Sequence, residues 1–224
     1  MDKNAFFERI AARLGRPPIG DPPERSVVGM PARDPGRAED RPRRFAAELE
    51  AVGGRVHRVR DLAEAHALLL TIWNRFRVRR AVAWARSEFE AWDLDWLFLH
   101  GAARAYGDPG LSGPRELRAA LLSAHLGLTT ADFGIAETGS LLVSASRTRP
   151  RAVSLLPPLH VALLKTNQLV DTLGQALERF STEGMPSTLH SITGPSRTSD
   201  IENDLTIGVH GPAAVEVILL GKEA

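Results

Sequence analysis

The sequence predicts an α/β domain with a largely parallel central sheet, preceded by a helix on a proline-rich arm. Helical and strand-like segments alternate after residue 43, which is typical of parallel sheets. The 224 residues are 43% hydrophobic, which is enough for a substantial buried core. Between residues 15 and 42 the chain holds seven prolines, so little regular structure is expected there. We therefore divide the chain into an arm, residues 1–42, and an α/β domain, residues 43–224.

The first residues of the arm are predicted to form a short amphipathic helix. Phe7, Ile10 and Leu14 recur at helical spacing, and Gly15 supplies a stop. A helix of this length cannot bury its apolar stripe alone. We therefore expect it to dock either on its own domain or on a neighbouring subunit of a homo-oligomer.

In the first half of the domain, apolar residues recur at helical spacing in three segments and at strand-like spacing in two. The predicted helices begin at Phe45, span residues 61–76 and run from Pro114 to residue 124, and the predicted strands lie at residues 56–59 and 81–84.

In the second half, short apolar runs predict strands separated by a single helix. The expected strands lie at residues 133–136, 141–143, 152–156 and 161–164, the helix lies at residues 173–180, and three further strands end at Thr193, Gly208 and Leu220. Ser199 and Glu202 have the spacing of a capping box, so a helix is expected to begin there.

The composition excludes several classes of function. With 28 basic and 27 acidic residues the net charge is +1, so no overall field recruits nucleic acid or an anionic membrane. The chain has no cysteine, which excludes disulfides, thiol nucleophiles and cysteine-ligated zinc or iron–sulfur centres. The longest charge-free apolar run, residues 152–164, is shorter than the ~20 residues of a membrane-spanning helix. We expect a soluble, cytoplasmic protein without a membrane span.

Three glycine-containing loops in the last third of the chain are the most informative feature for function. They carry the motifs AETGS, TGPSRTSDIE and GVHGP, each at an expected strand end. Glycine lets backbone N–H groups approach a ligand, and neighbouring hydroxyl and guanidinium groups can hold an anion. We expect the loops to form one pocket. The predicted ligand-binding residues are Thr138, Gly139, Ser140, Gly194, Pro195, Ser196, Arg197, Thr198, Gly208 and Gly211.

Two residues of these loops are candidate catalytic groups. Glu137 could act as a base, as a nucleophile or as an acceptor for a substrate hydroxyl, and its alternative role is that of an ordinary turn residue. His210 could carry a proton or donate a hydrogen bond. Arg197 suits a carboxylate or phosphate, and its alternative role is an ion pair within the domain. A phosphate loop would need a lysine where Ser140 stands, and no histidine belongs to a spaced set of metal ligands, so no metal site is predicted.

Taken together, four motifs resemble the lactate-utilisation protein C family, whose core is called the LUD domain. They are AETG at residues 136–139, PPLH at 157–160, GPSRTSDIE at 194–202 and GVHGP at 208–212. The resemblance covers about residues 43–220. It implies a three-layer α/β/α fold with a mostly parallel central sheet, of the kind shared with sugar-phosphate isomerases and CoA transferases.

The resemblance also implies a function in bacterial carbon metabolism. The family takes part in oxidising L-lactate to pyruvate as one component of a three-protein system, in which the partner proteins carry the iron–sulfur clusters. Whether this chain is itself an enzyme stays open. CoA transferases use a glutamate in a Glu-x-Gly turn, which residues 137–139 match in pattern, so Glu137 could attack an acyl group.

Three hypotheses follow. In the first, the chain is a component of the lactate-oxidising system, with Arg197 holding a small carboxylate and Glu137 or His210 addressing its 2-hydroxyl. In the second, it is a stand-alone transferase-like enzyme acting on an anionic, nucleotide or CoA-bearing ligand. In the third, it is a non-catalytic assembly factor for the iron–sulfur partners.

Overall fold

The computed structural model describes residues 3–15, 38–199 and 205–221, and it divides the chain into two units, residues 1–34 and 35–224. The first unit contains the predicted N-terminal helix, α1 (Lys3–Leu14). Most of the proline-rich arm lies outside the described residues, as does Glu202. The elements below belong to the second unit.

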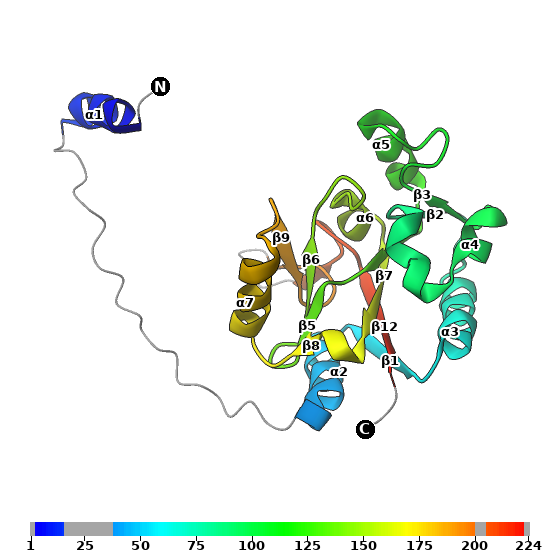
Figure 1. Ribbon diagram of the computed structural model, residues 1–224. Coiled ribbons are helices and arrows are strands. Elements are labelled where there is room, and N and C mark those ends of the chain that lie inside the picture. The colour runs from blue at the N-terminus through cyan, green and yellow to red at the C-terminus, as the bar shows by residue number, and fades with distance from the viewer. Residues whose placement is uncertain (1–2, 16–37, 200–204, 222–224) are drawn as a thin grey trace. The chain divides into compact units, whose positions relative to one another are not determined.

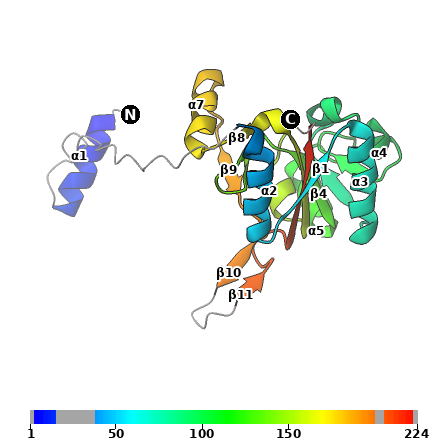
Figure 2. The same ribbon diagram turned by 90° about the horizontal axis from the view of Figure 1, so that it is seen from below.

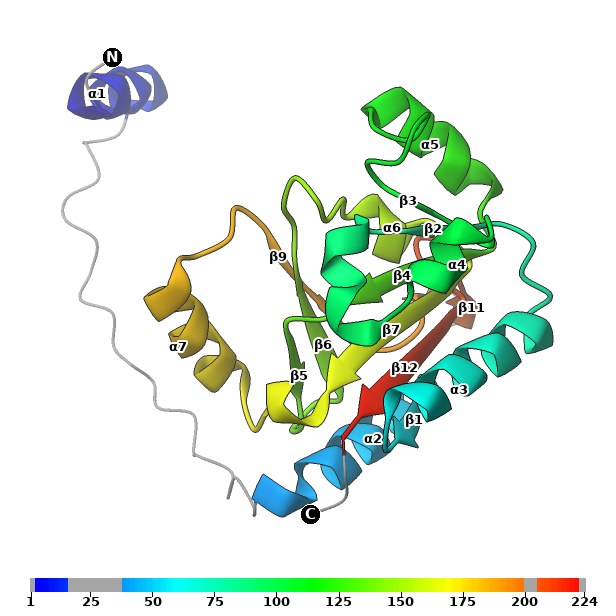
Figure 3. The ribbon, with the colours of Figure 1, turned by 45° about the vertical axis from the view of Figure 1, so that its right-hand side comes forward.

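The centre of the domain is a six-stranded sheet in which every neighbouring pair is parallel. The strand order is β1-β12-β7-β4-β2-β3 (Figures 1 and 3). The strands are β1 (Arg55–Val59), β2 (Ala81–Ala83), β3 (Ala103–Ala105), β4 (Leu126–Thr130), β7 (Leu159–Lys165) and β12 (Ala214–Leu220). β4, β7 and β12 are buried along almost their whole length, as expected of parallel strands covered on both faces.

A second sheet and a hairpin complete the β structure. The second sheet has the order β8-β5-β6-β9 and is mostly antiparallel, with a parallel pair at β5 and β8. Figure 2 shows the β10–β11 hairpin extending from the domain. The strands are β5 (Phe133–Ile135), β6 (Ser140–Ser144), β8 (Leu169–Val170), β9 (Leu189–Ile192), β10 (Arg197–Ser199) and β11 (Leu205–Ile207).

Helices flank both sheets. They are α2 (Arg41–Ala51), α3 (Leu62–Arg75), α4 (Asp95–Leu99), α5 (Pro114–Ser123), α6 (Ala152–Leu155) and α7 (Leu173–Glu183), with short 3-10 helices η1 (Ala38–Asp40), η2 (Arg86–Trp92) and η3 (Thr166–Gln168). α2 and α3 lie on opposite sides of β1 (Figure 2), and α7 covers the second sheet (Figure 1). No helix among the described residues is both long and apolar enough to cross a bilayer.

Local sequence explains where the main helices begin. The Asp61 carboxylate accepts a hydrogen bond from the Glu64 backbone N–H and caps α3. The Thr172 hydroxyl caps α7 in the same way, by accepting from the backbone N–H of Gln175. α2 has a proline in its first turn and buries Phe45 and Leu49. Because α2 packs against β1 and β8, it contacts both sheets and positions the loops described below.

The predicted α/β fold with a mostly parallel central sheet is confirmed, but one local prediction is wrong. Residues 152–156 contain helix α6 instead of a strand, because the run is followed by two prolines and its N–H groups bond locally, such as Leu156 to the carbonyl of Ala152. Ser199 is the last residue of β10 and pairs with Leu205 of β11, and the helix predicted to begin there falls on residues 200–204, outside the described residues.

Candidate functional site

A chain of three hydroxyl groups joins the first two predicted loops. Oγ1 of Thr138 lies 2.7 Å from Oγ of Ser140, and that atom lies 2.7 Å from Oγ1 of Thr193. Ser140 is buried, whereas Thr138 and Thr193 are at the surface. The structure therefore brings the AETGS turn and the TGPSR loop together, as the sequence predicted for these two segments.

Glycine is required at both loops by close packing against α2. Gly139 has φ 64°, and a Cβ atom there would lie 2.2 Å from the backbone nitrogen of Leu49. Gly194 has φ 84°, and a Cβ atom there would lie 2.9 Å from Cγ2 of Val52. The absence of a side chain lets these loops lie directly on the C-terminal half of the helix.

Arg197 caps the end of α2. Its Nη2 donates a hydrogen bond of 2.7 Å to the carbonyl oxygen of Val52, the residue that follows the last turn of the helix. A cation is favourable there because the helix dipole is negative at its C-terminus. Among the described residues this carbonyl, and not a carboxylate, is the partner of Arg197, so the alternative role as half of an ion pair is not observed. The remaining guanidinium N–H groups face the exposed surface.

The third predicted loop lies against the second. The Ser196 N–H donates to the carbonyl of Pro212 at 2.9 Å, and the Gly208 N–H donates to the carbonyl of Ser196 at 2.9 Å. A Cβ atom on Gly211 would lie 3.0 Å from Cβ of Ser196. His210 is exposed on this loop. We refer to residues 136–140, 193–198 and 208–212 as the loop cluster.

Glu137 is hydrogen-bonded to a residue that binds the first turn of α2. Its N–H donates to the carbonyl of Asp171 at 3.1 Å. The Asp171 carboxylate binds Arg41 at 2.6 Å and Arg44 at 3.5 Å, both in the first turn of α2, whereas Arg197 binds beyond the last turn. The hydrogen bond from Arg41 lowers the pKa of Asp171, against a smaller opposing effect of burial.

His160, in the PPLH motif, is a core residue. It is fully buried, and its Nε2 lies 2.9 Å from Oγ1 of Thr129. Burial, with a smaller contribution from His190, lowers the pKa of His160 to about 3. The ring is therefore neutral near pH 7. It packs in the core and does not exchange a proton with a ligand.

A pocket of about 360 Å³ lies at the carboxyl ends of β4 and β7, and we call it the carboxyl-edge pocket. Its lining includes Glu88, Trp92, Thr130, Asp132, Arg149 and Lys165. β2 and β4 are neighbours in the sheet. From β2 the chain continues to β3 at one edge of the sheet, whereas from β4 it continues in the opposite direction along the strand order, to β7. Parallel α/β proteins bind ligands outside the carboxyl ends of the strands where the strand order reverses in this way.

One wall of this pocket is a network of ion pairs in which each charged side chain has a partner. Nε of Arg149 lies 2.6 Å from the Glu88 carboxylate, and its Nη1 lies 2.6 Å from Oδ1 of Asp132. Oδ2 of Asp132 accepts from the Ser144 backbone N–H at 2.6 Å, and the Arg149 guanidinium lies over the Trp84 ring. Burial alone would lower the pKa of Arg149, but the two carboxylates raise it above its ordinary value.

The lining also includes a lysine and a bridging amide. Lys165 ends β7, and its Nζ lies 6.0 Å from the centre of the Trp92 ring. Within the described part of the chain, no carboxylate lies within ion-pair distance of Lys165. The Gln168 side chain donates to the carbonyls of Ala131 and Asp132 and accepts from the Lys165 N–H, so it fixes the ends of β4 and β7 relative to each other.

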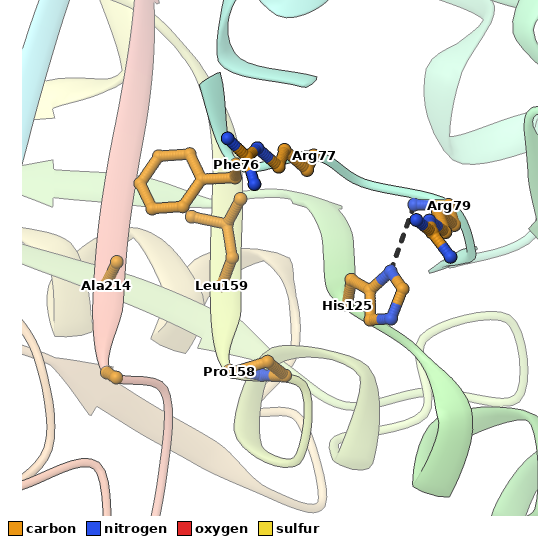
Figure 4. Close-up of a pocket in the computed structure, with 8 residues that line it drawn as sticks. Phe76, Arg77, Arg79, His125, Pro158, Leu159 and Ala214 are labelled. Carbon is orange, nitrogen blue, oxygen red and sulfur yellow. Dashed lines mark hydrogen bonds between the residues drawn. The ribbon is translucent and has the colours of Figure 1, made fainter. Parts of the chain in front are cut away.

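Two further pockets have a different setting. One, of about 470 Å³, lies at the amino ends of β7 and β12 and is lined by Arg77, Arg79, His125 and Leu159 among others (Figure 4). In it the Arg79 backbone N–H donates to Nδ1 of His125 at 3.0 Å. We call it the amino-edge pocket. The other lies between α7 and Arg41. Neither is at the carboxyl edge, so the carboxyl-edge pocket is the better candidate for a small ligand.

None of the three pockets includes Glu137, Arg197 or His210. The structure therefore unites the three loops but does not place these three side chains in one of the pockets above. Conversely, sequence reasoning missed Asp132 and Lys165. Asp132 stands two residues after a buried strand, which is a usable signal, but β4 itself was not predicted and so its carboxyl end was not recognised. Among the described residues, no three His, Asp or Glu side chains are placed to hold a metal ion.

Comparison with known proteins was made by sequence and by structure. A sequence model of the LUD domain matches residues 42–220. Lactate utilization protein C of Exiguobacterium sp. is 29% identical, over 98% of this chain and 96% of that protein. Lactate utilization protein C of Bacillus velezensis is 31% identical, over 71% of this chain and 70% of that protein. The crystal structure of a DUF162 family protein from Deinococcus radiodurans superposes with a TM-score of 0.60 at 22% identity, over 83% of this chain and 99% of that one, so the two share a fold.

Proposed function

The chain belongs to the LUD domain family, and from this premise we propose that it is a component of a bacterial L-lactate utilisation system, in which L-lactate is oxidised to pyruvate together with iron–sulfur partner proteins. The observation that carries the proposal is the similarity to proteins named lactate utilization protein C, one of which aligns with 98% of this chain.

The proposal divides the work between this chain and its partners. Oxidation of L-lactate to pyruvate releases two electrons and two protons. Clusters that accept single electrons are usually held by cysteine thiolates, and this chain has none. The electrons would therefore pass to clusters in the partners, while this chain binds ligand or partner.

The loop cluster remains our proposed anion site, for a small carboxylate or a phosphate-bearing ligand. Arg197 supports this proposal because only one of its N–H groups is used for the Val52 carbonyl. Thr138 and Thr193 add surface hydroxyls. Glu137 and His210 remain the candidate proton carriers, because neither side chain has a hydrogen-bond or ion-pair partner among the described residues.

The test is growth on L-lactate. A host strain that lacks the gene for this chain should fail to grow on L-lactate and should recover when the wild-type gene is returned. The Arg197→Ala variant should not restore growth, although it should still co-purify with the partners. Arg118→Ala, which removes an exposed arginine of α5, is the matched control and should restore growth.

Other outcomes separate the alternatives. Undiminished growth of the deletion strain on L-lactate would refute the proposed role. Loss of the partners' clusters in the deletion strain, with Arg197→Ala fully active, would favour an assembly factor. Thioester exchange by the purified chain, abolished by Glu137→Gln, would favour the transferase.

A further inference from the structure

We infer that the carboxyl-edge pocket is the place where this chain holds a small 2-hydroxy carboxylate, with Lys165 binding the carboxylate group. The inference rests on the proposed function, because L-lactate is such a compound. It assigns the substrate carboxylate to Lys165, whereas the sequence-based hypothesis assigned it to Arg197. The loop cluster would then serve a different anionic group.

Several polar side chains that line the pocket already have hydrogen-bond or ion-pair partners within the protein, without a ligand. Arg149 shares its guanidinium between Glu88 and Asp132, and Gln168 uses both ends of its amide on the backbone of β4 and β7. Groups that satisfy each other fix the shape of a site, because changing them would leave a buried charge or dipole unpaired. The binding groups must therefore be the polar groups that remain.

Lys165 and Thr130 are two such side chains, at the ends of the adjacent strands β7 and β4, and the exposed amide of Asn167 also lines the pocket. The Lys165 ammonium has no carboxylate partner among the described residues, and the Thr130 hydroxyl has no hydrogen-bond partner among them. Thr130 is 8% exposed as a residue, and its hydroxyl is not among the fully buried polar side-chain atoms that lack a partner, so it is accessible from the pocket. A hydroxyl that lines a pocket and has no protein partner indicates a position for a polar ligand atom or a water molecule.

The chemistry of these groups matches a 2-hydroxy carboxylate. An ammonium group binds a carboxylate by a charge-assisted hydrogen bond. The Thr130 hydroxyl can donate to, or accept from, the 2-hydroxyl on the neighbouring carbon. Phe133 and Phe180 supply an apolar wall for the alkyl group. The four charged side chains of the lining sum to zero, and Lys165 is the one among them without an ion-pair partner in the described part of the chain.

The inference is tested by calorimetric titration of the purified full-length chain with L-lactate. Lys165→Met keeps the length of the side chain and removes its charge, and it should weaken binding about tenfold or more. Lys165→Arg should stay within a few-fold of the wild type. Arg79→Met, which removes one charge from the amino-edge pocket, is the matched control and should bind as the wild type does.

A second measurement isolates the hydroxyl contact. Propionate is lactate without its 2-hydroxyl, so the wild-type chain should bind it about tenfold more weakly. Thr130→Val should reduce this preference to near unity, and the fold should tolerate it because the hydroxyl has no protein partner.

Equal affinity of the wild type and Lys165→Met for L-lactate would overturn the inference, as would a loss of binding in Arg197→Ala alone. Absence of saturable lactate binding by the wild-type chain would also overturn it. The growth test of the proposed function is independent of these results. If growth on L-lactate depends on the gene but lactate affinity does not change in Lys165→Met, the proposed binding site is wrong while the role in lactate utilisation stands.

Discussion

Burial sets the protonation state of His160, and with it the part this residue can play. A histidine followed by an apolar strand could equally be a surface proton carrier or a core residue. The fold decides, because β7 is an interior strand and the hydrogen bond to Thr129 satisfies only one ring nitrogen. Nδ1 of His160 and Nδ1 of His190 have no hydrogen-bond partner among the described residues. Charging such a ring in the core is unfavourable.

The stability of the protein should therefore fall in mild acid, in part through His160. Its pKa is about 3 in the folded chain against 6.5 as the ordinary value, so below about pH 6.5 the unfolded chain takes up a proton that the folded chain refuses. This contributes up to about 1.4 kcal/mol of lost stability for each pH unit between these values. His160→Gln retains a partner for Thr129 and should lower the slope of the unfolding free energy against pH, as measured by urea unfolding. An unchanged slope would contradict a buried neutral histidine.

At the scale of elements, α2 is the support on which the loop cluster is built. Gly139, Gly194 and Arg197 all contact its C-terminal half, and Asp171 binds its first turn. The loops therefore owe their position to one helix, and a change that displaces this helix should move them together.

Replacement of Gly139 by alanine tests this dependence. The new methyl group would overlap the Leu49 backbone at a positive φ angle, so the variant should lose about 3 kcal/mol or more of its unfolding free energy. Gly174→Ala is the matched control, since it lies in α7 and its nearest contact would be 3.7 Å away. That change should be neutral or should stabilise by up to about 1 kcal/mol. Thermal or urea unfolding of both variants would show the contrast, and equal stabilities would contradict it.

At the scale of the whole domain, α2 links the two sheets through packing and charge. It packs against β1 of the central sheet and β8 of the second sheet, and Arg41 and Arg44 bind Asp171 directly after β8. Among the described strands, none of the central sheet pairs with one of the second sheet, so α2 is a separate connection between the two.

Asp171→Asn should therefore destabilise the domain by about 2 kcal/mol near neutral pH. The pKa of Asp171 is lowered in the folded chain, so its contribution is present above the ordinary carboxyl pKa and is lost as the pH falls through the folded value. The difference between wild type and variant should consequently shrink in acid. A difference in urea midpoint that does not depend on pH would show that the carboxylate charge is not responsible.

The sequence allowed the class of fold to be predicted, because period and composition are local properties. It did not reveal β4, whose five residues include only two large apolar side chains, or distinguish α6 from a strand in a run of similar apolar content. The carboxyl-edge pocket could not be predicted from the sequence for a stronger reason. Asp132 and Lys165 are 33 positions apart, and they meet only because β4 and β7 are neighbours in the sheet. Strand order depends on long-range pairing that periodicity does not encode.

The last strand of the chain lies inside the sheet. β12 is inserted between β1 and β7, and β1 pairs with no other strand among the described residues. During translation, β1 is therefore made early but has no partner until residues 214–220 leave the ribosome. The sheet can close only after β12 has been made, which leaves β1 exposed to chaperones in the meantime. A nascent chain stalled before β12 should remain sensitive to protease around β1, and release of the finished chain should remove that sensitivity.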